Sequence, residues 1–325
     1  MEEKNKSGEC PICTRRTSPL FSVPCDYRKP FNSRRYAIDW CEVCDYGQVW
    51  ERPSRAEIPG FYQLENYYTH NSQSTSQLQP RKTFFDRLRA HLSYRFDRGE
   101  PLTPDDALSL LEGDSLTICE IGCGNGGNLL QFMKQGFSGV GVEPDPCARD
   151  AAKKSGMLVF QGTAEELPEE VLEPKFDVVL MSHVLEHCLD INAAVSNAKR
   201  ILKQGGIFIV ETPNCHSRGF KSYQGEWPWS DIPRHLNFFT PSSLNLILTK
   251  YGFSVAKTKY DGFFRQFTNT WLENEAEIWQ SFAHYDSKRD SPPNFKLRAW
   301  KLLLKSVLSS KAMKYDSIRL IAINS

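Results

Sequence analysis

The stretch from Leu116 to Gly127 constrains the fold of this chain more than any other part of the sequence. It reads LTICEIGCGNGG, a short run of apolar and β-branched residues followed by glycines at positions 122, 124 and 126. Such a run is typical of a strand, and the residues after it can begin a helix. Glycines allow a sharp turn and let a ligand approach the backbone with no Cβ in the way. The stretch therefore predicts a strand, a ligand-binding turn and a helix in succession.

A second predicted strand, Val140–Val142, ends in the acid Glu143, which follows Gly122 by 21 residues. This spacing fits one βαβ unit in which the acid accepts both hydroxyls of a ribose. Dinucleotides and S-adenosylmethionine are both held in this way. The turn here is E-x-G-x-G-x-G rather than the G-x-G-x-x-G of dinucleotide-binding proteins, and Glu120 in the first strand is placed to reach a cationic amino-acid group.

This turn resembles motif I of the class I S-adenosylmethionine-dependent methyltransferases. Later motifs resemble the same family, so that the resemblance covers residues 115–261 and the last strand. It implies an α/β fold with a seven-stranded Rossmann-like sheet and S-adenosylmethionine as the cofactor. It also implies which residues bind that cofactor: the backbone of Thr163 and Ala164 and the side chain of Glu165 beside the adenine, Glu143 at the ribose, and Gly122, Gly124 and Gly126 at the amino-acid end.

The chemistry is expected at the end of the predicted strand Phe176–Met181, which continues into Ser182 and His183. In open α/β sheets, ligands bind at the carboxyl ends of strands near the point where the strand order reverses. Ser182 is therefore expected beside the methyl group that is transferred. No D-P-P-Y-like tetrad follows this strand, which argues against methylation of amino groups in DNA bases or protein amides.

Four residues form a candidate catalytic group, namely His183, Glu186, His187 and His235. The first three occupy positions i, i+3 and i+4, which share one face of a helical turn. Some related O-methyltransferases hold a divalent cation with an acid-x-x-Glu-His arrangement and a later histidine, and here His183 stands in the place of the first acid. We hypothesise that His187 or His235 is a general base on a substrate hydroxyl, because an imidazole pKa of about 6.5 suits that task. The alternatives are a metal site, or a turn that Glu186 and His187 cap and pack.

The first part of the chain carries two C-x-x-C pairs separated by 27 residues, Cys10 with Cys13 and Cys41 with Cys44. Each pair can offer two thiolates to one tetrahedral zinc ion, so residues 1–60 are predicted to form a zinc-ribbon-like module. The alternatives are buried thiol pairs or a redox pair. A redox role is disfavoured because such motifs begin a helix after a strand in a thioredoxin-type unit, which the sequence around these pairs does not indicate.

The charge of residues 1–60 bears on the partner of this module. Ten basic and nine acidic residues leave a balance of +1, which does not predict a nucleic-acid-binding surface. Many bacterial small-molecule and sugar methyltransferases carry a similar cysteine module, followed by a tyrosine-rich stretch like Phe61–Tyr68. The resemblance therefore implies a structural or substrate-positioning role.

Residues 61–115 are predicted to connect the module to the sheet as a helical connector or lid. The tyrosines at 62, 67 and 68 are expected to pack or to form part of the lid, and Asn71–Gln79 is rich in serine and glutamine. Apolar residues recur at helical spacing over 82–97, which predicts an amphipathic helix. His91 lies on this apolar stripe, which favours a core or capping role for it. The stripe consists of Phe84, Phe85, Leu88, His91, Leu92 and Phe96.

The sheet domain is predicted to span residues 116–325, with two additions. Residues 212–240 form a long insert that is aromatic and polar at once, which suits a substrate pocket wall; Trp227 and Trp229 either line that pocket or anchor the loop. Residues 263–314 form a helical insertion before a final strand within Asp316–Asn324.

Composition limits the surroundings in which the chain acts. Net charge is +1, and no run of 18 apolar residues predicts a membrane span. The first residues lack an apolar secretory segment, so the ten cysteines are expected in a reducing, cytoplasmic compartment. The helix predicted within 295–314 is basic and amphipathic. Such a helix can lie on an anionic membrane or near a lipid-linked substrate, or it packs as a solvated flank of its own protein.

The resemblance and the motifs together predict methyl transfer from S-adenosylmethionine to an oxygen or a carbon of a small-molecule, sugar or lipid-linked acceptor. One alternative is an RNA methyltransferase guided by the zinc module. Another is a non-catalytic scaffold, against which the intact glycine turn and Glu143 argue. The acceptor and the oligomeric state are not set by the sequence.

Overall fold

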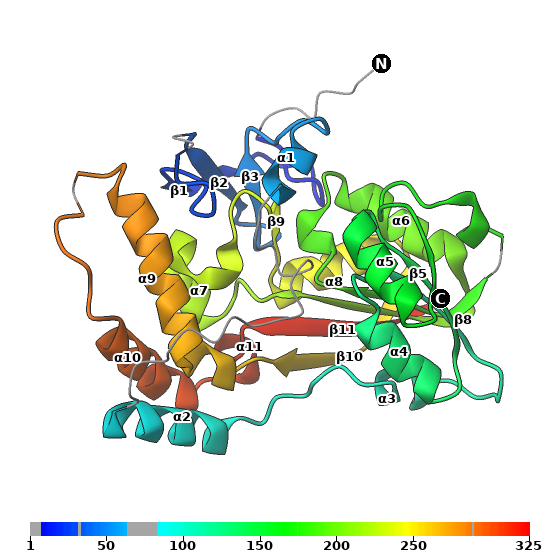
Figure 1. Ribbon diagram of the computed structural model, residues 1–325. Coiled ribbons are helices and arrows are strands. Elements are labelled where there is room, and N and C mark those ends of the chain that lie inside the picture. The colour runs from blue at the N-terminus through cyan, green and yellow to red at the C-terminus, as the bar shows by residue number, and fades with distance from the viewer. Residues whose placement is uncertain (1–7, 32–33, 64–82, 174, 288) are drawn as a thin grey trace.

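A large mixed sheet forms the centre of the computed structural model, which describes residues 8–31, 34–63, 83–173, 175–287 and 289–325. Its strands are β4 (Thr117–Ile121), β5 (Ser138–Val142), β6 (Leu158–Phe160), β7 (Phe176–Ser182), β8 (Leu202–Pro213), β10 (Phe253–Asp261) and β11 (Ser317–Asn324). Their order is β6-β5-β4-β7-β8-β11-β10, as Figure 1 shows in part. Strands β4 to β8 are parallel to one another, whereas β11 runs antiparallel between β8 and β10. The predicted seven-stranded α/β sheet is confirmed.

Alternation along the strands gives the sheet two apolar faces, because successive side chains point to opposite sides. Ile118 packs on one face with Leu129 and Phe132, whereas its neighbour Cys119 packs on the other with Ala194 and Leu244. Helices cover both faces, which is the usual condition for buried parallel strands. They are α3 (Asp105–Leu108), α4 (Gly127–Lys134), α5 (Pro146–Lys154), α6 (Ile191–Ile201) and α8 (Pro241–Lys250), with the short 3₁₀ helix η1 (Glu169–Val171).

A second, smaller sheet contains β1 (Ser18–Val23), β2 (Tyr36–Cys41), β3 (Tyr46–Trp50) and β9 (Asn237–Phe238), in that order. The predicted module 1–60 supplies three of these strands, and β9 comes from the insert 212–240. The Tyr46 hydroxyl also donates to Asn237 Oδ1 at 2.6 Å. The module is therefore joined to the sheet domain by strand pairing and does not end as a separate unit at residue 60.

A second hydrophobic core lies outside the large sheet and joins three segments that are distant in sequence. Val23 and Trp40 from the first segment, Trp227 from the insert, and Phe282 and Leu302 from the helical insertion belong to one buried cluster. We call these segments together, described residues 8–63, 215–238 and 263–315, the accessory body. Besides strands β1, β2, β3 and β9 it contains α1 (Ile58–Tyr62), α7 (Arg218–Tyr223), η3 (Gln224–Glu226), η4 (Pro228–Ser230), η5 (Phe264–Phe267), α9 (Asn269–Ala283), α10 (Phe295–Val307) and α11 (Lys311–Lys314).

Buried polar contacts also hold the accessory body together. Arg234 is fully buried, and its guanidinium lies 2.7 Å from Asp26 and 2.9 Å from Asp231. Arg28 donates to the same Asp231 at 3.0 Å. Trp227 is 0% exposed, so the structure makes it a loop anchor rather than part of a pocket wall.

The connector differs from its prediction in one respect. Helix α2 (Phe84–Phe96) forms where expected, but the side that it buries is polar: Asp86, Arg89 and Ser93 are buried, whereas His91 is exposed. The predicted apolar stripe packs only in part: Leu92 contacts the second hydrophobic core, whereas Phe84, Phe85 and Phe96 are exposed. Arg89 is buried instead, because it donates to Phe267 O at 3.0 Å and Asn269 Oδ1 at 2.9 Å. Tyr67, Tyr68 and Asn71–Gln79 lie outside the described residues. Within the described residues, no helix combines the length and the apolar character needed to cross a membrane.

Candidate functional site

The glycine turn after β4 borders open space on one side. Gly122, Gly124 and Gly126 have φ values of 70°, 53° and 81°, a region that favours glycine. A Cβ at Gly122 would lie 2.4 Å from Val184 Cγ2, and one at Gly126 would lie 2.2 Å from Met157 Sδ. A Cβ at Gly124 would meet nothing within 4 Å. Packing therefore excludes side chains at two positions, and the third borders open space.

Glu143 is held in a fixed position beside this turn. It is 7% exposed, and its two carboxylate oxygens accept from the backbone N–H of Gly124 and of Asp145, each at 2.9 Å. Burial raises the pKa of this carboxyl, although the two backbone hydrogen bonds oppose that effect. An ionised carboxylate offers about four acceptor positions, so two remain for the hydroxyls of a ribose.

Glu120 has a different environment from the one predicted. It is 1% exposed, and its oxygens accept from Asn128 Nδ2 at 3.0 Å and from the Leu129 N–H at 2.9 Å. Burial raises its pKa to about 8. Both carboxylate oxygens of Glu120 thus accept hydrogen bonds from the first turn of α4. The sequence instead predicts a contact with a cationic group of the ligand.

The predicted adenine-side residues form a loop after β6. The Thr163 N–H donates to Glu166 O, and Ala164 is buried. Glu165 Oε1 accepts from the Leu189 N–H at 2.8 Å, which ties this loop to the segment after β7. Ser182 is the last residue of β7 and pairs with Glu211 of β8, so it lies at the carboxyl edge as expected.

His183 and Glu186 contact each other at this edge. The backbone of His183 has a φ of 56°, and its Nδ1 lies 3.1 Å from Glu186 Oε1. Burial lowers the pKa of His183, but the hydrogen bond and negative charge of Glu186 outweigh it, so the pKa is raised. The group that was predicted as one helical turn is instead the 3₁₀ helix η2 (Leu185–His187), which follows the left-handed His183.

Glu186, His187 and His235 form a tighter cluster. One oxygen of Glu186 and one ring nitrogen of each histidine lie within 4.8 Å of one another. Nδ1 of His187 lies 3.0 Å from Arg234 O, and Nδ1 of His235 lies 2.7 Å from Trp229 O. A carbonyl only accepts, so Nδ1 of each ring carries the proton and a neutral ring leaves Nε2 without one.

Burial, together with the nearby His187, lowers the pKa of His235 to about 4. His235 is therefore neutral near pH 7, and it is a weak proton acceptor. Glu186 Oε2 is buried and has no hydrogen-bond partner among the described residues. An unpartnered carboxylate oxygen beside two imidazole nitrogens is a donor set that fits a divalent cation or a polar hydrogen of a substrate.

Trp229 completes one wall of this region. Its ring stacks on His183, with centroids 4.9 Å apart and planes at 7°, and its Nε1 donates to Asp316 Oδ2 at 3.1 Å. The Arg265 guanidinium lies 4.9 Å from the Trp229 ring and pairs with Asp316. Sequence reasoning singled out Trp229 but missed Arg265 and Asp316, because they come from two separate segments and belong to no local motif.

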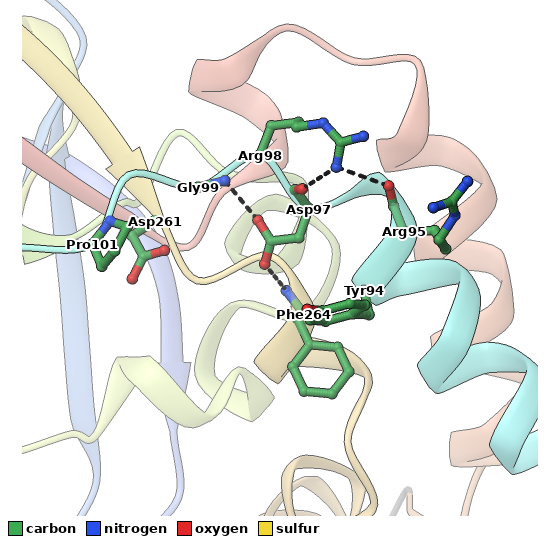
Figure 2. Close-up of a pocket in the computed structure, with 8 residues that line it drawn as sticks. All are labelled: Tyr94, Arg95, Asp97, Arg98, Gly99, Pro101, Asp261 and Phe264. Carbon is green, nitrogen blue, oxygen red and sulfur yellow. Dashed lines mark hydrogen bonds between the residues drawn. The ribbon is translucent and has the colours of Figure 1, made fainter.

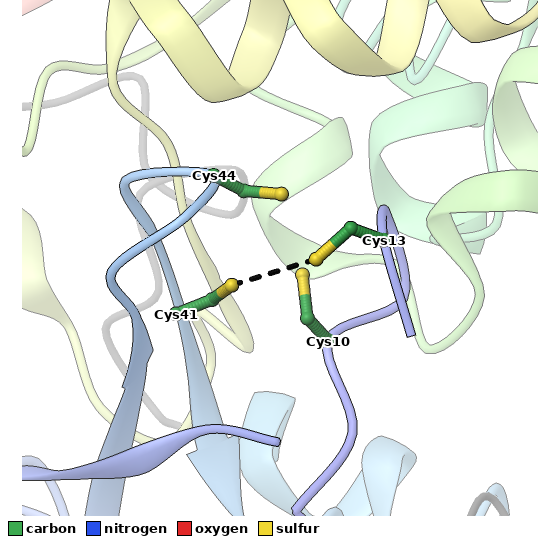
Figure 3. A group of neighbouring side chains, drawn as sticks. All are labelled: Cys10, Cys13, Cys41 and Cys44. Carbon is green, nitrogen blue, oxygen red and sulfur yellow. Dashed lines mark hydrogen bonds between the residues drawn. The ribbon is translucent and has the colours of Figure 1, made fainter. Parts of the chain in front are cut away.

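The four predicted cysteines come together at one edge of the smaller sheet (Figure 3). The sulfurs of Cys10, Cys13, Cys41 and Cys44 all lie within 4.8 Å of one another, and those of Cys13 and Cys41 are 3.6 Å apart. Zinc–sulfur bonds of about 2.3 Å in a tetrahedron place sulfurs about 3.8 Å apart. The donor set fits structural zinc. Cys25, outside the cluster, is buried.

Two hollows lie away from these residues. Figure 2 shows one of about 560 Å³ between the end of α2 and the end of β10, lined by Tyr94, Arg95, Asp97, Arg98, Gly99, Pro101, Asp261 and Phe264. Another, of about 250 Å³, lies between β1 and the η3 segment. Neither hollow is lined by a residue that the sequence predicted for the site.

The strand order, the glycine turn and the acid that follows β5 together define a class I methyltransferase fold. Residues 81–258 match the family model described as methyltransferase domain, which is more than half of the chain. The chain therefore belongs to this family of S-adenosylmethionine-dependent enzymes.

Curated relatives match about half of this chain. A ubiquinone biosynthesis O-methyltransferase of Azorhizobium caulinodans is 33% identical over 164 residues, which cover 47% of this chain and 64% of the relative. The protein of the same name from a Bradyrhizobium species is 31% identical over 157 residues, covering 45% and 58%. The chain thus spans less than two thirds of the length of these relatives.

Solved structures with a similar arrangement include S-adenosylmethionine-dependent methyltransferases of two other organisms. The protein from Thermotoga maritima is 22% identical with a TM-score of 0.45, and the match covers 74% of this chain and 98% of that one. The protein from Archaeoglobus fulgidus is 18% identical with a TM-score of 0.45, covering 74% and 94%.

Proposed function

We propose that this protein transfers the methyl group of S-adenosylmethionine to a hydroxyl oxygen of a small molecule. The observation that carries the proposal is Glu143, fixed by two backbone N–H groups beside Gly124, which itself faces open space. This arrangement suits a nucleoside whose ribose is held by the carboxylate while its amino-acid end crosses the glycines. The name O-methyltransferase, carried by the relatives, supports oxygen as the acceptor atom.

The acceptor hydroxyl is proposed to lie near His187 and His235, at the carboxyl edge of the sheet. His187 is the better candidate base of the two, because a pKa of about 4 makes His235 a weak proton acceptor. His187 takes the hydroxyl proton, the oxygen attacks the methyl carbon, and the bond from that carbon to sulfur breaks. The leaving group is S-adenosylhomocysteine, whose sulfur carries no charge. The backbone carbonyls of Arg234 and Trp229 orient the two rings.

A divalent cation is the second candidate for this cluster, since Glu186, His187 and His235 offer an oxygen and two nitrogens within 4.8 Å. When bound, such a cation lowers the pKa of a hydroxyl that coordinates it. Glu186, His187 and His235 would then be the three ligands. The carbonyls of Arg234 and Trp229 would keep the two histidine rings in position.

A structural zinc ion at Cys10, Cys13, Cys41 and Cys44 belongs to the same proposal. Support comes from the spacing of the sulfurs and from the position of the cluster. Pro11, between the first two cysteines, accepts through its carbonyl from Asn192 of α6 and Lys250 of α8. Zinc in this place would therefore fix the accessory body against the sheet domain.

The test combines cofactor binding with turnover. Calorimetry with S-adenosylmethionine comes first, followed by methyl transfer from labelled cofactor to a panel of phenols, catechols and sugars. The His187→Ala variant is expected to bind the cofactor like wild type and to lose roughly 100-fold or more in kcat. His284→Ala, a change at an exposed histidine outside the cluster, is the matched control.

Three results would overturn parts of this proposal. An absence of heat with S-adenosylmethionine would exclude the cofactor, and methyl transfer only to carbon would exclude the oxygen acceptor. Full turnover by His187→Ala would exclude the histidine as base. Loss of turnover with a chelator that removes divalent cations, and its return with added manganese, would identify the cluster as a cation site; unaffected turnover would exclude the cation.

A further inference from the structure

Two helices of the described chain run side by side at one end of the molecule, far from α4, α5 and α6 (Figure 1). Lys296, near the start of α10, pairs with Asp86, near the start of α2, at 2.8 Å. Lys314, after α10, donates to Phe96 O at the end of α2. The two helices therefore lie parallel and form one surface.

Helix α10 is apolar on two sides. Ala299, Leu302 and Leu303 face the accessory body and are buried. Leu297, Leu304 and Leu308, by contrast, are 51%, 70% and 93% exposed. With Lys301 they occupy positions i, i+4, i+7 and i+11, which form a single stripe along a helix. Burying one side of α10 in the protein thus leaves a leucine stripe in contact with water.

Helix α2 adds aromatic side chains to this surface. Phe84, Phe85 and Tyr94 are 73%, 66% and 68% exposed, although they belong to a helix whose buried side is polar. We call the exposed surface of these two helices the α2–α10 face. Its apolar members are Phe84, Phe85, Tyr94, Phe96, Leu297, Leu304 and Leu308.

The α2–α10 face is also strongly basic. Residues 84–98 and 295–314 contain ten basic and two acidic residues, a balance of +8, while the whole chain carries +1. The other residues therefore carry −7. Both acids are occupied: Asp86 pairs with Arg89 and Lys296, and Asp97 accepts from the Gly99 and Phe264 N–H groups. Some basic residues are occupied too, since Arg89 is buried, Arg298 pairs with Glu226 and Lys311 pairs with Glu100. Five others are exposed, namely Arg87, Arg95, Arg98, Lys301 and Lys305. The charge that this face presents to solvent is positive.

We propose that the α2–α10 face docks on an anionic lipid bilayer. Exposed leucines and phenylalanines among lysines and arginines are the signature of a helix that lies in the membrane interface, where apolar side chains enter the acyl region and basic ones meet the headgroups. A symmetric dimer through this face would place the two positive surfaces against each other. Nucleic-acid bases could stack on the aromatic residues of this face but not on its leucines, and the three exposed leucines favour the bilayer as the occupant.

The position of the face suits an acceptor that reaches the site from a membrane. The hollow of about 560 Å³ lies between α2 and η5 and is lined by Tyr94 and Phe264 (Figure 2). The next residue, Arg265, contacts Trp229 at the candidate active site. Docking itself does not depend on the proposed methyl transfer, so the two proposals can fail separately.

The test is flotation of the full chain with vesicles of phosphatidylcholine, with and without phosphatidylglycerol. Wild type is expected to float only with the anionic vesicles and to be released when salt rises from about 0.1 M to about 0.5 M. A Leu304→Ser, Leu308→Ser variant is expected to lose roughly 10-fold or more in vesicle affinity. Lys301→Glu, Lys305→Glu is expected to lose a similar amount. Leu158→Ser changes a 56%-exposed leucine on β6 and should float like wild type.

Several outcomes would overturn the proposal. One is failure of wild type to float with anionic vesicles; another is equal flotation of the leucine variant and the Leu158→Ser control. A third is a dimer in sedimentation velocity that the leucine variant abolishes, since a second copy would then be the occupant. A fourth is tighter binding of single-stranded RNA than of anionic vesicles at the same salt. Circular dichroism verifies that every variant retains its fold.

Discussion

The two sides of the candidate active site are built in different ways. On the cofactor side, residues 116–145 supply the glycine turn and Glu143. The side-chain hydrogen bonds of Glu120 and Glu143 there join residues at most 19 positions apart, as from Gly124 to Glu143. On the acceptor side, His235 and Trp229 are held by the accessory body, whose ion pairs join residues such as Asp26 and Arg234, 208 positions apart. A local segment makes one side, and three distant segments make the other.

This difference predicts which substitutions affect only one side of the candidate active site. The glycine turn and Glu143 are built by β4, α4 and β5, which pack in the sheet domain. On the acceptor side, Glu186 and His187 also come from the sheet domain, but His235 and Trp229 are positioned by the insert, which shares one buried cluster with the module and the helical insertion. Damage to the accessory body should therefore impair the acceptor site while the affinity for S-adenosylmethionine stays close to that of wild type.

The largest effect is expected from the cysteine cluster. Cys41→Ser removes one of four donors and should abolish zinc binding, which supplies on the order of 10 kcal/mol in small zinc domains. Mass-spectrometric metal analysis should show about one zinc per chain in wild type and none in the variant. Proteolysis should cut the variant within 8–63, while the Kd for S-adenosylmethionine changes less than about 2-fold. Cys147→Ser, at an exposed cysteine, is the control. Loss of cofactor binding would show that the two sides are not separable.

The second largest effect is expected from the buried ion pair between Asp26 and Arg234 in the accessory body. Asp26→Ala leaves Arg234 buried with only Asp231 as an acidic partner. Removing one member of such a pair costs about 3–5 kcal/mol of unfolding free energy. Urea unfolding measures this loss. Glu57→Gln breaks an exposed pair with Arg34 and should cost less than about 1 kcal/mol. Equal losses in the two variants would contradict the structural role of the Arg234 contacts.

His235 should make the stability of the protein depend on pH. Its pKa falls to about 4 in the folded state, against about 6.5 when unfolded. The unfolded chain therefore binds more protons between these values, and stability is complete above pH 6.5 and is lost as pH falls toward 4. The loss amounts to roughly 3 kcal/mol. Unfolding at several pH values should show a flatter dependence in His235→Gln than in wild type or in His284→Gln. An unchanged slope in His235→Gln would contradict the assignment.

The smallest effect is expected on the cofactor side. Glu143→Gln removes the charge that accepts the ribose hydroxyls and should weaken S-adenosylmethionine binding by about 1.5–3 kcal/mol, roughly 10- to 100-fold. Calorimetry measures the Kd, and Asp150→Asn, at an exposed acid on α5, is the control. Resistance of residues 8–63 to proteolysis should not change. If Glu143→Gln bound S-adenosylmethionine with wild-type affinity, the assignment of Glu143 to the cofactor site would be wrong.

Several features could be predicted from the sequence because their signals are local. The turn at Gly122 to Gly126 depends on residues within a few positions of one another. The two cysteine pairs could be recognised because a tetrahedral ion requires that spacing. The polar buried side of α2 could not be predicted, because the partners are remote: Arg89 is buried since Phe267 and Asn269 offer acceptors about 180 positions away.

The sequence alone determined the sheet domain, since alternating strands and helices around a glycine turn permit few other folds. It also determined which histidines belong near the strand ends. Only the tertiary structure decided that strands β1, β2 and β3 share a sheet with β9 and a core with α9 and α10. The physical reason is that the burial of a side chain depends on every segment that covers it, whereas a sequence motif contains only residues that are close together in the chain. For the same reason, the leucines of α10 appear as an exposed stripe only after the opposite side of the helix is packed.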